Sequence, residues 1–94
     1  MIVPAGGGVK VKRASSTLSY PHGESTTPVA LGVPAKVVMV NYGSGFSAET
    51  AWVMPGDAAD RGWGLSADGQ TLLFNTNTSS TTGGSFDYTY VAWY

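Results

Sequence analysis

The chain of 94 residues is long enough for one domain and too short for two ordinary hydrophobic cores. Its apolar fraction of 43% is typical of a globular protein, whereas its charged fraction of 12% is only half the ~25% that such proteins usually carry. Five Lys and Arg residues against six Asp and Glu give a net charge of −1, which excludes a strong bulk attraction to nucleic acid or anionic lipid.

The absence of cysteine excludes disulfide scaffolds, Cys-type zinc sites, thiol catalysis and iron–sulfur clusters. Residues 1–8 lack both the charged start and the apolar stretch of a signal peptide, so we interpret them as a loose leader. No window approaches the ~20 apolar residues that span a bilayer. We expect a soluble protein without membrane insertion, folded as a single β domain over residues 1–94.

The first half of the chain shows short alternating or β-branched runs and almost no helical periodicity. Residues 9–13 predict a strand with Val9 and Val11 inward and the cations outward. Residues 15–20 predict a second short strand. Residues 26–31 contain a proline, which places a third strand at a sheet edge.

The middle of the chain predicts a central strand and its partner. Residues 35–42 are apolar on both alternating faces, which indicates a central strand. After a glycine turn at 43–45, residues 46–54 predict the partner strand, in which Trp52 and Met54 share a face. Residues 55–62 are a loop by composition.

The last third of the chain contains a hairpin, a polar loop and an aromatic strand. Residues 63–66 and 70–75 flank an Asp-Gly turn, which is a strong hairpin signal. Residues 76–85 are rich in Ser, Thr and Gly and predict an exposed loop. Residues 86–94 predict a strand buried on both faces or on an intersubunit surface. The sum is an all-β antiparallel sandwich or small barrel of about seven or eight short strands.

The best candidate ligand-binding residues are Asp57, Asp60 and Arg61 in the loop before the hairpin, and Trp63 beside that loop. Two carboxylates and a guanidinium could hold a cation or hydrogen-bond a sugar while Trp63, predicted as the most exposed of the three tryptophans, stacks on the sugar ring. The D-x-x-D spacing lacks the alternating ligands of a calcium loop, and no cleft supports a glycosidase pair. The alternative interpretation is a solvated loop with a local Asp–Arg pair.

Catalysis has little support in the sequence. His22 is the only histidine, and no second His or Cys exists to complete a transition-metal site. We interpret His22 as an exposed turn residue and expect no enzymatic activity, no metal and no cofactor.

Residues 63–77 (WGLSADGQTLLFNTN) and 84–94 (GSFDYTYVAWY) resemble the C-terminal region of tail fibres and other virion structural proteins of tailed bacteriophages. Such chains often end on a hairpin, a Ser/Thr/Asn/Gly loop and a strand with alternating tyrosines. The resemblance covers about a third of the chain. It implies a β-rich tip domain, commonly trimeric, that assembles on a virion and touches a host surface glycan or protein.

The leading hypothesis is therefore a non-enzymatic virion structural or receptor-binding domain, located on the virion beside other virion proteins. We predict a homo-oligomer, with a trimer favoured, whose interface comprises Phe86, Tyr88, Tyr90 and Tyr94. One alternative is a monomeric carbohydrate-binding module using the loop residues and Trp63. A second alternative is a small hydrolase with His22 as its base.

Overall fold

A computed structural model describes residues 9–21, 23–43, 49–59, 62–76 and 84–94. Within these ranges the chain forms seven β-strands and no helix. The strands are β1 (Val11–Tyr20), β2 (Ser25–Ala30), β3 (Val37–Tyr42), β4 (Glu49–Val53), β5 (Trp63–Leu65), β6 (Thr71–Thr76) and β7 (Gly84–Trp93). The predicted all-β class is confirmed.

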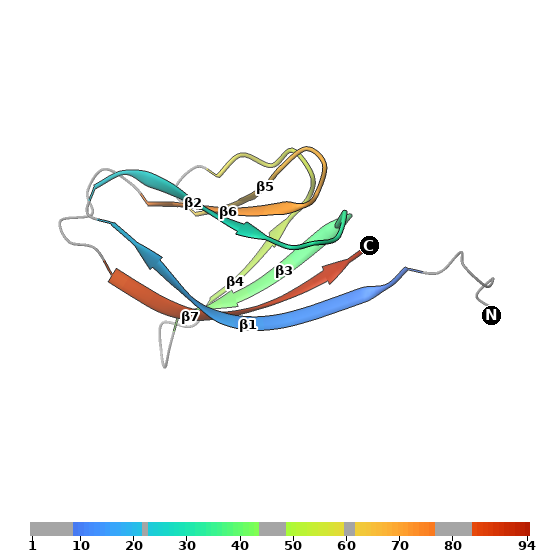
Figure 1. The fold of residues 1–94 in the computed structure, drawn as a ribbon, viewed down its shortest axis with the longest axis horizontal. Helices are drawn as coiled ribbons and strands as arrows, with labels where there is room; N and C mark the ends of the chain where they lie inside the picture. The colour runs from blue at the N-terminus through green and yellow to red at the C-terminus, as the bar shows by residue number, and fades with distance from the viewer. Residues whose placement is uncertain (1–8, 22, 44–48, 60–61, 77–83) are drawn as a thin grey trace.

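The strands form two antiparallel sheets that pack against each other as a sandwich (Figure 1). The four-stranded sheet has the order β1-β7-β3-β4, and the three-stranded sheet has the order β2-β6-β5. Figure 1 shows the three-stranded sheet as the upper layer and the four-stranded sheet as the lower one. The two sheets do not close into a barrel, so the structure decides between the two predicted architectures in favour of the sandwich.

Strands far apart in the sequence pair in a nested order. The first strand, β1, pairs with the last, β7, over ten residues each, and β2 pairs with β6. Next to the β1–β7 pair, Lys10 and Tyr94 exchange two backbone hydrogen bonds of 2.6 and 2.8 Å. Only the pairs β3–β4 and β5–β6 join neighbours along the described chain.

The core lies between the facing sides of the two sheets, where alternate side chains of every strand point inward. Its fully buried side chains are Leu31, Val38, Val40, Leu65 and Leu72. An aromatic cluster continues this core, with ring centroids 4.8–6.2 Å apart among the closest pairs of Tyr20, Tyr42, Trp63, Phe74, Phe86 and Tyr88.

The predicted hairpin is confirmed, since β5 and β6 pair antiparallel around the Asp68-Gly69 turn. The Asp68 carboxylate accepts hydrogen bonds from the Ser66 hydroxyl at 2.6 Å and the Gln70 backbone N–H at 3.0 Å. Gly69 has a φ of 74°, and its backbone lies so close to Ala35 that a Cβ atom there would overlap the Ala35 carbonyl oxygen. Only glycine satisfies both requirements without strain.

The N-terminal prediction was wrong in two respects. Residues 11–20 form one continuous strand, and the strand has the opposite facing, because Val11 is 46% exposed and Val9 is also exposed. The facing is set by Leu18, which is buried in the core. Because side chains alternate along a strand, this places Lys12 on the inner side, where its ammonium donates a hydrogen bond to the Leu31 carbonyl.

The remaining strand predictions agree with the structure in the described ranges. β2 lies at a sheet edge and contains Pro28, β3 is central, and β4 pairs with β3. The predicted loop 76–85 is shorter than expected, because Thr76 is a buried residue of β6 and β7 begins at Gly84. Its residues 77–83 lie outside the described ranges.

Candidate binding face

The predicted ligand-binding tryptophan belongs to the core. Trp63 is only 8% exposed, and its ring contacts those of Tyr42, Phe74, Phe86 and Tyr88. The prediction that it is exposed was wrong because its side chain points toward the four-stranded sheet, whereas the preceding loop lies against the opposite side of β5. The Leu65 N–H donates to the Asp57 carbonyl at 2.9 Å, and Gly64 packs directly against the loop backbone.

Of the other predicted loop residues, the structure describes Asp57 alone. The Asp57 carboxylate is exposed and accepts a hydrogen bond of 2.7 Å from the Met54 backbone N–H. This bond closes the turn after β4, so the Asp57 carboxylate stabilises the conformation of the turn. Asp60 and Arg61 lie outside the described residues, as does His22.

The rings predicted to form an oligomer interface serve this chain's own core. Tyr88 and Tyr90 are buried, and Phe86 packs against the aromatic cluster. Tyr94 is half-buried beside Lys10. The interface prediction was wrong for the inward rings, because the second sheet already covers the face of β7 that carries them.

The outer face of the four-stranded sheet is the side that the other sheet leaves open, and it is divided into two halves. One half comprises the ends of β1 and β3 and the starts of β4 and β7. Its side chains are polar and form hydrogen bonds across strands: Ser15 pairs with Thr89 at 2.8 Å, and Thr50 donates to Asn41 at 2.6 Å. The other half is mostly apolar and also carries Arg13. Its apolar members are Val9, Val11, Val37, Met39, Trp52, Met54, Val91 and Trp93.

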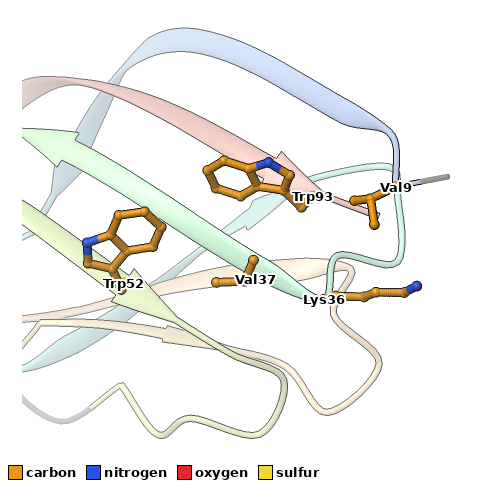
Figure 2. A pocket seen from close by; sticks show the side chains of 5 residues that line it. All are labelled: Val9, Lys36, Val37, Trp52 and Trp93. Atoms are coloured by element: carbon orange, nitrogen blue, oxygen red, sulfur yellow. The ribbon is translucent and has the colours of Figure 1, made fainter. Parts of the chain in front are cut away.

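An open groove of about 330 Å³ lies on this apolar half, lined by Val9, Lys36, Val37, Trp52 and Trp93. The two indole rings form what we call the tryptophan platform: their centroids are 5.9 Å apart and their planes differ by 18°. Figure 2 shows the rings side by side over the sheet, with Val37 beside them. Trp52 is 61% exposed, so most of its surface is accessible to solvent.

Sheet register explains how two tryptophans from different strands meet. Trp93 of β7 lies opposite Val37 of β3, and Met39 of β3 lies opposite Trp52 of β4. The two indoles therefore flank β3, where the small Val37 leaves room for them to lean toward each other. The Lys36 backbone N–H donates to the Trp93 carbonyl at 2.6 Å and fixes the start of β3 beside the platform.

Sequence reasoning missed this platform because it predicted Trp63 as the most exposed of the three tryptophans. A signal was present, since Trp52 alternates with Ala51 and Val53, and Trp93 alternates with the tyrosines. One face of each strand had to be buried, and an indole on the opposite face had to lie outside the core.

Over the described ranges, no group of three His, Cys, Asp or Glu residues that could hold a metal ion occurs. The same ranges contain no helix that is long and apolar enough to cross a membrane.

A comparison of the chain with models of protein families, with curated proteins and with solved structures finds no significant match.

Proposed function

We propose that this protein is a non-enzymatic recognition domain that binds carbohydrate through the tryptophan platform. The observation that carries the proposal is the pair of nearly parallel indole rings formed by the exposed Trp52 and the half-buried Trp93. An exposed apolar patch on a small protein typically marks an interaction site. This patch is flat, open and aromatic, and it sits on a rigid sheet that holds both rings in place.

The chemistry of the face suits a sugar. A pyranose ring presents C–H groups on its faces and hydroxyls around its rim, so it needs an apolar plane next to hydrogen-bonding groups. The platform provides the plane. The same face of the sheet also provides hydrogen-bonding groups. Thr50 lies two residues before Trp52 in β4, and its hydroxyl is hydrogen-bonded to the side-chain amide of Asn41. Hydroxyls and amides of this kind both donate and accept hydrogen bonds.

The resemblance of residues 63–77 and 84–94 to phage tail-fibre termini supports a biological setting for this activity. In that setting the domain lies on a virion, and the platform contacts a glycan of the host surface. A homotrimer remains part of this proposal. Its interface would have to use surfaces other than the inward rings of β7, because those rings fill the core of one chain.

Affinity electrophoresis tests the proposal, with native gels that contain xylan, galactan, polygalacturonate or κ-carrageenan. At least one polysaccharide should retard the wild-type protein. Trp52→Ala and Trp93→Ala should each weaken that retardation several-fold, because an aromatic contact of this kind contributes about 0.5–1.5 kcal/mol beyond the area it buries.

Met54→Ala is the matched control, since Met54 is exposed on the same half of the face but does not line the groove. It should migrate like the wild type. The proposal fails if no polysaccharide retards the wild-type protein, or if both tryptophan variants are retarded as strongly as the wild type.

A further inference from the structure

We infer that the glycan recognised by the tryptophan platform is anionic, with a carboxylate or sulfate group that Lys36 and Arg13 bind. The inference rests on the proposed function, because it assigns a charge class to the ligand of the same site. It follows from the positions of the cations around the groove and from the absence of internal partners for them in the described chain.

Lys36 is the only charged side chain among the five residues that line the groove. Its backbone is fixed by the hydrogen bond to the Trp93 carbonyl, so the side chain starts from a defined place beside the platform. Figure 2 shows Lys36 at the end of the groove below Val9, with its side chain running away from the two indole rings. Because a lysine side chain is long and flexible, its ammonium can turn toward the rim of a sugar stacked on Trp93.

Arg13 adds a second positive charge on the same sheet face. The register places Arg13 opposite Val91, one alternation from Trp93 on the same strand. Diagonal neighbours across two antiparallel strands lie within reach of a long side chain. Arg13 is exposed, and its planar guanidinium suits the two oxygens of a carboxylate or a sulfate.

Neither cation is neutralised by the protein over the ranges that the structure describes. No carboxylate there forms an ion pair with Lys36 or Arg13. The one acidic side chain on the outer face of β7 is Asp87, which lies at the polar end and accepts a hydrogen bond from Thr17 at 2.7 Å. The platform half of the face is thus positively charged, although the whole chain has a net charge of −1.

A single-stranded nucleic acid is the competing ligand, since bases also stack on indoles. Nucleic-acid affinity depends on several cations that follow successive phosphates. Two cations beside a short platform do not form such a track. One or two anionic sugars fit the number and spacing of these charges better.

Isothermal titration calorimetry with paired probes tests the inference. Trigalacturonate and its methyl ester have the same sugar backbone and differ in charge, and κ-carrageenan oligosaccharides are compared with their desulfated forms. The first pair reports on carboxylate and the second on sulfate. Because an exposed ion pair contributes up to about 1 kcal/mol, we expect the anionic form of one pair to bind about two- to fivefold tighter for each cation.

Lys36→Gln should abolish most of that preference and retain the binding of the uncharged form, and Arg13→Gln should reduce it. Ser19→Glu is the matched control, because it lowers the net charge by the same one unit at the far end of β1. It should keep the preference. Raising the salt concentration should weaken binding of the anionic form only.

The inference is overturned if the wild type binds both members of each pair equally, or if Lys36→Gln keeps the full preference. Binding to oligo(dT) that is tighter than to any of the sugars, and lost in Trp52→Ala, would assign the platform to nucleic acid instead. Failure of the proposed function gives a different result, since the wild type would then bind neither charged nor uncharged sugars.

Discussion

Replacing Trp63 by alanine should destabilise the protein far more than replacing Trp52, although both changes remove an indole. At ~25 cal/mol per Å² and roughly 150–250 Å² for an aromatic side chain, the burial of Trp63 contributes about 3.5–5.5 kcal/mol. The burial of Trp52 contributes about 1.5–2.5 kcal/mol on the same scale. These values follow from exposed fractions of 8% for Trp63 and 61% for Trp52.

We therefore expect Trp63→Ala to lower the free energy of unfolding by about 3–5 kcal/mol, in the range of large-to-small changes in cores. Trp52→Ala should lower the free energy of unfolding by about 1–2 kcal/mol, because the substitution removes only the contacts of the Trp52 ring with Trp93 and with the sheet. With a urea m-value of about 2 kcal/mol per M, the two unfolding midpoints should differ by about 1 M.

Urea unfolding followed by far-UV circular dichroism measures this difference without relying on tryptophan fluorescence. Trp63→Phe serves as the rescue variant, because it keeps an aromatic ring among Tyr42, Phe74 and Phe86. It also removes the buried indole N–H, which has no hydrogen-bond partner among the described residues. Equal midpoints for Trp63→Ala and Trp52→Ala would refute the assignment of Trp63 to the core.

Two further predictions concern the hairpin turn. Gly69→Ala should destabilise the protein by at least ~2 kcal/mol more than Gly56→Ala in thermal unfolding. Both glycines have a positive φ, but only at Gly69 does the Ala35 backbone occupy the place of a Cβ atom. Equal losses of stability in the two variants would contradict this close approach. The Ser66 hydroxyl and the Gln70 N–H hold the pKa of Asp68 below its ordinary value of 3.8, so the stability from these bonds is present above pH 3.8 and is lost as the pH falls through the lowered pKa. An NMR titration should show the midpoint of Asp68 rising toward 3.8 in Ser66→Ala, and an unchanged midpoint would exclude the hydroxyl as the main cause.

The sequence predicted the elements of the fold well where alternation and turn chemistry act locally. The hairpin around Asp68-Gly69 and the central position of β3 follow from residues close together in the chain. The side of β1 that faces the core could not be predicted in this way, because Val11 and Leu18 are both apolar and their spacing puts them on opposite faces. Leu18 is the residue that is buried, because its side of β1 packs against the second sheet. That packing involves strands far away in the sequence.

The candidate site illustrates the same limit. The position of Trp63 next to a polar loop predicted exposure, whereas its burial results from packing against Tyr42, Phe86 and Tyr88 of the other sheet. The platform of Trp52 and Trp93 depends on β7 and β4 flanking β3, which is a fact of strand order. Alternation alone indicates that each indole faces away from the core, but only the register brings the two within 5.9 Å.

The nested order of strand pairing has a consequence for how the protein is made. The pairs β3–β4 and β5–β6 can form as soon as their residues leave the ribosome, whereas β1 and β3 both wait for β7. Pairing of such distant segments is intrinsically slow, so insertion of β7 is expected to complete folding. Because β7 also brings Trp93 to its place beside Trp52, the platform does not exist on a partly synthesised or partly folded chain. Under the proposed function, a chain can bind its ligand only after β7 has paired with β3.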